Sequence, residues 1–466
     1  MTILTRLWQE PSIANSGRLP KNISIQAAIM TGVSVGDRSP RKYFYGIKVM
    51  QPLAVRNFRL LWIGSLISYV GAQLTLIAFP WLVLKLTGDP MAMGTVFALS
   101  SIPRVVFMVF GGAFTDRFSA RTMMIWSTVS RMGLMVALTI LVFSGTIQMS
   151  MVYGIALLFG VLDAFFWPAS SAIVPRLVDT EQLPAANALI QGISQMSVML
   201  GPVVAGLIIS LFSSGAGEGS ADLSGIGFVF LLDSASFLVA LLTLFLIRLE
   251  TEHESQSPFT LGSVYESVAA GFAAMWNDLP IRIMTLVFAI FSLFWRGPYL
   301  VGVPVLCDSR FEDGALAFGL IASSYGVGAL VGIVAAGSLP KLNEKWFGIM
   351  VLVDIAILGS SFWVYAITPT VDWALFATAF CGIVDGYLMV VLISWLQARV
   401  QRELLGRVMS MIMVFNNGLA PVSAALAGWL ISISLEGVFL GAGGILVGLA
   451  LFGVCVPVVR RFGMTA

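Results

Sequence analysis

The amino-acid sequence predicts an all-α membrane protein with twelve transmembrane helices in two pseudo-symmetric six-helix bundles. Three observations lead to this fold class. The 466 residues are 58% hydrophobic and 11% charged, whereas soluble domains carry about 25% charged residues. Twelve stretches are long and apolar enough to cross a bilayer, and polar positions in the second half repeat those of the first at a constant spacing.

The helix expected for each span follows from length, because about 20 apolar residues in helical conformation cross a bilayer core. Breaking the chain at polar, glycine and proline clusters gives twelve segments. They are residues 58–84, 90–114, 122–144, 149–175, 183–212, 225–247, 282–306, 315–339, 346–368, 372–396, 408–433 and 437–459. Around them we expect five regions: a disordered basic N-terminal extension (1–55), the first bundle (56–248), a linker with an amphipathic helix (249–281), the second bundle (282–459) and a tail (460–466).

The distribution of basic residues predicts the orientation. The loops on the side of the N-terminus hold most of the lysines and arginines, whereas the opposite side holds only Lys85 and Arg310. Cytoplasmic loops carry such an excess of Lys and Arg. We therefore expect a multi-pass protein of the plasma (inner) membrane with both termini in the cytoplasm.

The two halves resemble each other at polar positions inside the spans. Four pairs are separated by 222 or 223 residues, as expected for an internal duplication of the kind found in secondary transporters. They are Asp163 with Asp385, Ser100 with Ser323, Gln73 with Arg296, and Arg131 with Asp354.

Seven charged residues lie inside predicted spans: Asp163, Asp233, Asp354, Asp385, Arg104, Arg131 and Arg296. A charge near the bilayer centre costs roughly 2.5–3.5 kcal/mol on insertion scales, so it usually faces a partner or a water-filled cavity. These residues are therefore the candidates for moving a polar or ionic group across the membrane.

Several functions are excluded by residue content. The single histidine, His253, lies in a charged loop, and the three cysteines are far apart in the chain. They show neither metal-ligand spacing nor a disulfide framework. With no nucleophile–base pattern and no phosphate-binding loop, we expect no enzyme, no metal, no cofactor and no use of ATP. The expected partners are a small-molecule substrate, protons and the lipid bilayer, and not nucleic acid.

After span two the sequence reads Gly112-Ala-Phe-Thr-Asp116-Arg117, with Arg121 four residues further on. This resembles the signature loop of the major facilitator superfamily. The resemblance implies that Asp116 latches a cytoplasmic gate between the halves, supported by Arg117 and Arg121. The chain departs from the pattern at Ser119, where the family usually has a second glycine, and at Ala120, where it usually has a basic residue.

Span five contains Gly201-Pro202-Val-Val-Ala-Gly206. It is similar to a Gly-Pro-x-x-Gly-Gly motif of superfamily exporters, and an ordinary packing kink is the alternative explanation. Together with Pro168-Ala-Ser-Ser-Ala-Ile-Val-Pro175, it resembles the bacterial branch of macrolide-efflux and enterobactin-export proteins.

The resemblance implies that spans one, four, seven and ten line a central cavity. Gln73, Asp163, Arg296 and Asp385 each lie about 14 or 15 residues into those spans, or roughly 21 Å along the helix. We predict that Asp163 and Asp385 exchange protons and that Arg296 biases their ionisation. Permanent pairing of either carboxylate with an arginine is the alternative. Structural pairing is the expectation for Arg104, Arg131, Asp233 and Asp354, because their spans more often pack beside the cavity.

These observations predict a monomeric secondary active transporter that exports a hydrophobic or amphipathic small molecule (drug, macrolide or siderophore) by proton-coupled alternating access. The alternatives are an importer or lipid transporter of the same fold, and a non-transporting membrane sensor or scaffold. The last alternative predicts that neutralising Asp163, Asp385 or Arg296 leaves activity intact.

Overall fold

A computed structural model of the chain describes residues 50–117, 119–213, 223–248, 272–273, 276–339, 346–400 and 418–460. The predicted N-terminal extension up to residue 49, most of the predicted linker, residues 401–417, which include the first part of predicted span eleven, and the tail from residue 461 lie outside the described residues. The chain divides into two units, Met1–Lys48 and Val49–Ala466, and everything below concerns the second.

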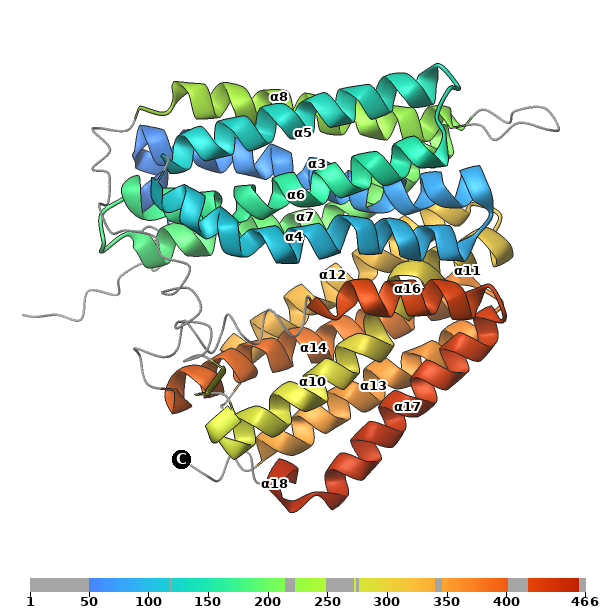
Figure 1. Ribbon diagram of the computed structural model, residues 1–466. Helices are drawn as coiled ribbons and strands as arrows, with labels where there is room; N and C mark the ends of the chain where they lie inside the picture. Colours follow the sequence, from blue (N-terminus) through green and yellow to red (C-terminus); the bar gives the residue numbers. More distant parts are fainter. Residues whose placement is uncertain are drawn as a thin grey trace, which may run out of the picture. The chain divides into compact units, whose positions relative to one another are not determined.

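All regular structure in the described ranges is helical (Figure 1). The first half contains η1 (Gln51–Ala54), α3 (Arg56–Thr87), α4 (Pro90–Arg117), α5 (Ala120–Phe143), α6 (Met149–Ile173), η2 (Val174–Arg176), α7 (Leu183–Phe212) and α8 (Ser224–Leu246). The second half contains α10 (Leu279–Gly297), η3 (Pro298–Gly302), α11 (Val303–Arg310), α12 (Gly314–Ser338), α13 (Phe347–Ile367), α14 (Val371–Arg399), α16 (Ala420–Ile431), α17 (Leu435–Cys455) and α18 (Pro457–Arg460).

The predicted fold class, an all-α multi-pass membrane protein, is confirmed. Within the described ranges, eleven helical stretches are long and apolar enough to cross a membrane. One shorter apolar helix, α16, corresponds to the second part of predicted span eleven. Span seven is composite, because α10, η3 and α11 together form the stretch Leu279–Arg310.

Short polar side chains and glycine mark the ends of several helices. Ser119 accepts a hydrogen bond from the Thr122 amide at the start of α5, and Ser434 accepts one from the Gly437 amide at the start of α17. Gly88 ends α3 in the left-handed region at φ 62°, which glycine adopts without a Cβ clash. Ser119, a departure from the family pattern, therefore has a local structural role as a helix cap.

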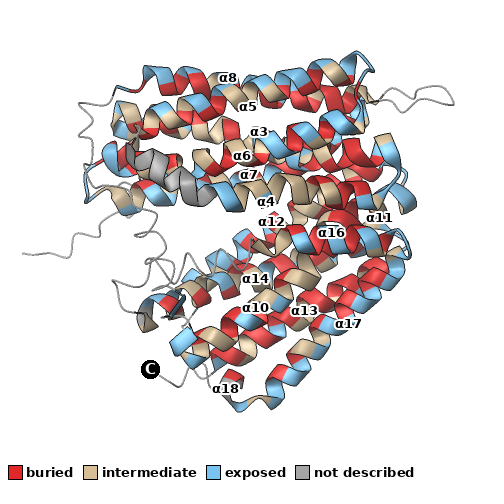
Figure 2. Cartoon of the chain, in the orientation of Figure 1, coloured by how far each residue is buried: buried red, intermediate tan, exposed pale blue. Residues whose placement is uncertain are grey.

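Burial follows the faces on which helices meet (Figure 2). The buried side chains are mainly apolar, whereas large apolar residues such as Leu211, Ile367 and Phe376 are exposed. Exposed apolar residues on this scale would be unfavourable in water. They are the expected surface of a protein that faces lipid acyl chains.

Equivalent helix pairs pack closely in the two halves. Gly160 of α6 lies against the backbone of Ser100 in α4, and Gly382 of α14 lies against the backbone of Tyr325 in α12. Gly160 and Gly382 are 222 residues apart. The internal repeat therefore extends to helix packing as well as to sequence.

Two helix pairs join the halves through glycines that are also repeat-related. A Cβ on Gly206 of α7 would lie 2.6 Å from the carbonyl oxygen of Ala315 in α12. A Cβ on Gly428 of α16 would lie 2.6 Å from the carbonyl oxygen of Pro90 in α4. Because small residues let helix backbones approach closely in membranes, these glycines permit the two seams, α7–α12 and α4–α16.

Candidate functional site

Asp163 of α6 lies between two arginines of the first half. Its Oδ2 is 2.8 Å from Nη2 of Arg104 in α4, and its Oδ1 accepts a hydrogen bond of 3.0 Å from Nη1 of Arg131 in α5. Asp163 and Arg131 are buried, whereas the Arg104 side chain is 40% exposed. The guanidinium of Arg131 also lies 3.9 Å from the ring centre of Phe166, in a cation–π contact.

Asp233 of α8 belongs to the same region. It is 1% exposed, and it accepts hydrogen bonds from the hydroxyls of Thr75 in α3, at 2.5 Å, and Ser236, at 3.0 Å. Arg131 lies within electrostatic reach of both Asp233 and Asp163. The first half therefore brings four of the predicted charges into one network: Arg104, Arg131, Asp163 and Asp233.

A second network occupies the equivalent place in the second half. Asp385 of α14 accepts a hydrogen bond of 2.5 Å from the hydroxyl of Tyr325 in α12. Arg296, in the last turn of α10, lies within electrostatic reach of Asp385 and Tyr325. Arg296 and Asp385 are both partly exposed. Asp354 of α13 interacts electrostatically with Asp385 and is 2% exposed.

Aromatic rings continue from this second network. Phe291, Trp295 and Tyr299 stack in succession, with ring centres 5.7 Å and then 4.9 Å apart. Tyr325 follows, 6.5 Å from Tyr299. The polar atoms of Arg296 and Asp385 therefore lie beside a ladder of large rings, the combination of a few polar groups and an apolar wall that small-molecule sites use.

Span seven changes helix type beside this ladder. The π-helical turn η3 separates α10 from α11, and such turns occur frequently at functional sites. Pro298 and Pro304 supply no amide donor there. The Gly297 amide, at the end of α10, donates instead to Oγ of Ser423 near the start of α16, at 2.7 Å. We expected one continuous helix over 282–306, and the two prolines explain the difference.

Gln73, the fourth residue of the predicted cavity cluster, lies on α3 against Gly201 of α7. The partners described for Asp163 come from the first half, and those described for Asp385 come from the second. The structure therefore groups the predicted residues into two networks. Sequence reasoning missed Tyr325, although it lies two residues after Ser323, which the repeat had marked.

The predicted cytoplasmic gate motif is only partly described. Gly112, Asp116 and Arg117 lie in the last turns of α4, and their side chains are outside the described part of the chain. Arg121 is described: its Nε and Nη2 donate to the carbonyl oxygens of Leu244 and Phe245 at the end of α8, at 2.9 and 3.1 Å. Arg121 thus neutralises the C-terminus of a helix, and the latch by Asp116 stays a prediction.

The motif of span five lies at the seam between α7 and α12. Pro202 and Gly206 both face α12, and the amide of Val203 donates to Oγ of Ser323 at 2.9 Å. Nε2 of Gln195 adds a hydrogen bond of 3.4 Å to the carbonyl oxygen of Gly326. The residues that resemble an exporter motif therefore form a contact between the halves.

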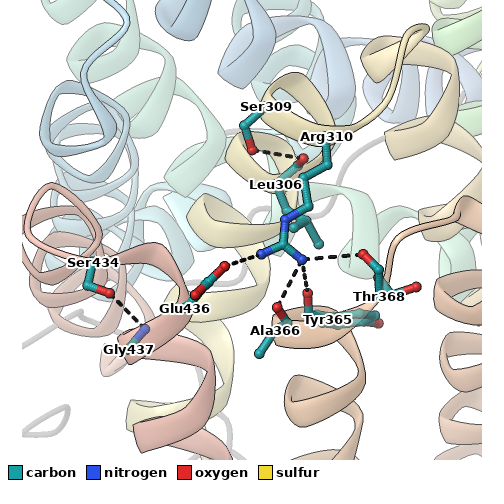
Figure 3. Close-up of polar contacts among 9 residues, drawn as sticks. All are labelled: Leu306, Ser309, Arg310, Tyr365, Ala366, Thr368, Ser434, Glu436 and Gly437. Atoms are coloured by element: carbon teal, nitrogen blue, oxygen red, sulfur yellow. Dashed lines mark hydrogen bonds and ion pairs between the residues drawn. The ribbon is translucent and has the colours of Figure 1, made fainter.

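An ion pair links the halves at the ends of spans one and seven that we predict to be outer. Nζ of Lys85 in α3 lies 2.6 Å from Oδ1 of Asp308 in α11. Arg310, two residues on, fixes α11 to its own half (Figure 3). Its Nη1 donates to three carbonyl oxygens at the end of α13, and its Nη2 lies 2.6 Å from Glu436 of α17.

Two further observations concern an apolar cavity and possible metal ligands. A cavity of about 250 Å³ among α10, α16 and α17 is lined almost entirely by apolar residues such as Leu293, Leu426 and Ile445, and none of the charged residues above lines it. Among the described residues, no group of three or more His, Cys, Asp or Glu is arranged to hold a metal ion.

A multi-pass helical fold, duplicated halves and two charge networks inside the spans are typical of a membrane transport protein. The chain belongs to the Major Facilitator Superfamily, whose family model matches residues 61–424. Members of this family move small molecules and are not enzymes.

Sequence relatives include the multidrug efflux pump Tap of Mycolicibacterium fortuitum, 23% identical over 78% of this chain and 87% of the relative. Macrolide efflux protein A of Streptococcus pyogenes is 21% identical over 76% of this chain and 84% of the relative. These matches agree with the branch that the span-five motif resembled.

Solved structures share the fold at low identity. The nucleoside transporter NupG has a TM-score of 0.66 at 14% identity, covering 86% of this chain and 98% of that one. A bacterial homologue of the iron transporter ferroportin, in an inward-facing state, has a TM-score of 0.64 at 15% identity, covering 85% and 98%.

Proposed function

We propose that this transporter exports a hydrophobic or amphipathic small molecule, of the drug, macrolide or siderophore type, in exchange for protons. The observation that carries the proposal is the similarity to a multidrug pump and a macrolide pump over about three quarters of the chain. In this proposal the protein is a monomer in the inner membrane, and both termini face the cytoplasm.

The second-half network supports this function. Asp385 can accept a proton, a hydrogen bond or a cation, and the ring ladder of Phe291, Trp295, Tyr299 and Tyr325 beside it offers an apolar surface to a large substrate. Arg296 favours the charged form of Asp385, whereas loss of water around the site favours the neutral form. Opening and closing of the site would therefore change the protonation of Asp385, which is the physical requirement for proton coupling.

Asp163 has a different place in this proposal. Two arginines hold it in the present conformation, so it can accept a proton only when one of these ion pairs opens. We propose that the pairs stabilise the first half while the second half exchanges protons. Gln73, packed on Gly201, would hold α3 and α7 of the first half together.

Accumulation of macrolides and fluorescent dyes in an efflux-deficient bacterial host tests the function. We expect the wild-type protein to lower accumulation. At equal expression, Asp385→Asn should abolish this effect, because the asparagine side chain cannot exchange a proton as a carboxyl group does. Asp372→Asn is the matched control, since Asp372 is exposed at the start of the same helix and should leave export unchanged.

Three results would contradict the proposal. Unchanged accumulation in cells that express the wild-type protein would remove drug and macrolide export. Export that continues after the pH gradient is collapsed would remove proton coupling, and greater accumulation with the protein than without it would indicate import.

A further inference from the structure

The two charge networks break the symmetry of the repeat at one position. Asp163 and Asp385 are equivalent by sequence, and so are Arg131 and Asp354. In the first half this position therefore supplies a cation that binds Asp163 at 3.0 Å. In the second half it supplies a second carboxyl group, which interacts electrostatically with Asp385. The same fold thus holds an acid–base pair in one half and an acid–acid pair in the other.

Within the described ranges of the chain, no cation forms an ion pair with Asp354. Asp354 is 2% exposed, and its buried Oδ1 has no hydrogen-bond partner among the described residues. Among the described residues, the ionisable groups that interact electrostatically with it are Asp385 and Cys381 of α14 and Tyr325 of α12. On α17, the ionisable residues lie at the two ends of the helix: Glu436, which binds Arg310, and Cys455.

The free-energy cost of ionising the Asp354 carboxyl group decides whether it is protonated. A buried carboxylate without hydrogen bonds or a counter-ion is strongly disfavoured, and a second carboxylate nearby adds repulsion. Arg296, on α10, interacts with Asp385, so its charge is shared with the more exposed member of the pair. Asp354 is therefore the member that holds a proton when Asp385 is charged.

We propose that Asp354 is the internal proton-binding residue of this transporter and exchanges its proton with water through Asp385. A proton from water binds Asp385, which is partly exposed. A water molecule between the two carboxyl groups then passes the proton on: the O–H bond on Asp385 breaks as the water takes that proton, the water gives another proton to the carboxylate of Asp354, and Asp385 returns to its contacts with Tyr325 and Arg296. Release reverses these steps, so that one proton enters and one leaves. The role in transport depends on the proposed function, whereas the protonation itself does not.

Infrared spectroscopy of the full-length protein in lipid nanodiscs tests the protonation without any substrate. A neutral carboxyl group has a C=O stretching band that shifts in D₂O. We expect this band to be lost in Asp354→Asn and to shift in Asp385→Asn. Asp163→Asn is the control, and its band should be that of the wild type because Asp163 is ion-paired. Identical wild-type and Asp354→Asn spectra would overturn the proposal.

Asp354→Glu provides a second variant that keeps the carboxyl group if the asparagine variant does not fold. We expect the band to persist at a shifted frequency, because the longer side chain places the acid in a different environment. A band at the wild-type frequency would assign it to another residue and overturn the proposal.

Transport in proteoliposomes tests the coupling role, with a radiolabelled macrolide as the probe. We expect Asp354→Asn to retain exchange of labelled for unlabelled macrolide and to lose accumulation driven by a pH gradient. Gradient-driven accumulation at the wild-type level in Asp354→Asn would overturn the coupling role. If the wild-type protein moves no macrolide, the proposed function fails, and the infrared result still decides the protonation of Asp354.

Discussion

At the scale of single residues, the seven intramembrane charges could be recognised from the sequence, because a charge within an apolar run is conspicuous. Their partners could not be. Whether Asp163 meets Arg131 depends on how α5 and α6 are rotated about their axes, and the hydrophobic pattern fixes such rotations poorly when helices are apolar on nearly every face. Tyr325 was missed for a related reason, since tyrosine is common on apolar surfaces.

The ion pair of Arg131 and Asp163 leads to a prediction about stability. Removing one partner of a buried pair leaves an uncompensated charge and costs about 3–5 kcal/mol. We therefore expect Arg131→Leu to lower the free energy of unfolding by roughly that amount, measured by thermal unfolding in detergent micelles.

Two further variants control this prediction. Arg104→Leu should cost less, because the Arg104 side chain is 40% exposed and water screens its charge. Arg131→Leu combined with Asp163→Leu should recover part of the loss, since the carboxylate of Asp163 is then removed together with its buried partner. If Arg131→Leu is as stable as the wild type, Arg104 alone is enough to compensate the negative charge of Asp163.

At the scale of helices, most spans were predictable because about 20 apolar residues between polar breaks are typical of a transmembrane helix. The interruption of span seven was not predicted. Pro298 and Pro304 were visible in the sequence, but prolines within transmembrane helices are often tolerated. The π-helical turn also depends on Ser423 of α16, which accepts from the Gly297 amide and donates to the carbonyl oxygen of Leu293.

The seam between α7 and α12 gives a prediction at this scale. We expect Gly206→Ala to force the two helices apart, because its Cβ would lie 2.6 Å from the carbonyl oxygen of Ala315. Spin labels on the two helices should then report a longer distance than in the wild type, measured by electron paramagnetic resonance.

Gly192→Ala is the matched control on the same helix. A Cβ at Gly192 would meet nothing within 4 Å, so the label distance should not change. By the internal repeat, Gly428→Ala should separate α16 from α4 in the same way. Wild-type distances in both Gly206→Ala and Gly428→Ala would mean that neither glycine is needed for close approach.

At the scale of the whole molecule, the internal duplication was the most informative property of the sequence. It showed that Asp163 is equivalent to Asp385, and Arg131 to Asp354, before any contact was known. It did not reveal that the two halves place these residues in separate networks, because a repeat relates equivalent positions and does not say which of them meet. Nor did it single out Lys85 and Asp308, which are also 223 residues apart and do meet.

The Lys85–Asp308 ion pair therefore joins equivalent ends of spans one and seven across the two halves. Both side chains are about one-third exposed, 39% and 31%, so the pair contributes only about 0.2–1 kcal/mol. That energy matters for the predicted alternating access, because two states of similar free energy respond to small changes. We expect Lys85→Ala to raise the ratio of outward-open to outward-closed protein by roughly 1.4- to fivefold.

Double electron–electron resonance checks this expectation, with nitroxide labels at Asp89→Cys and Glu312→Cys, two exposed positions near the pair. Cys455→Ser removes the exposed native thiol, and Cys307 and Cys381 are buried. The charge swap Lys85→Asp with Asp308→Lys should restore the wild-type distance distribution, and high salt should shift the wild type toward Lys85→Ala. A distribution that Lys85→Ala leaves unchanged would mean that the α7–α12 and α4–α16 seams alone hold these ends together.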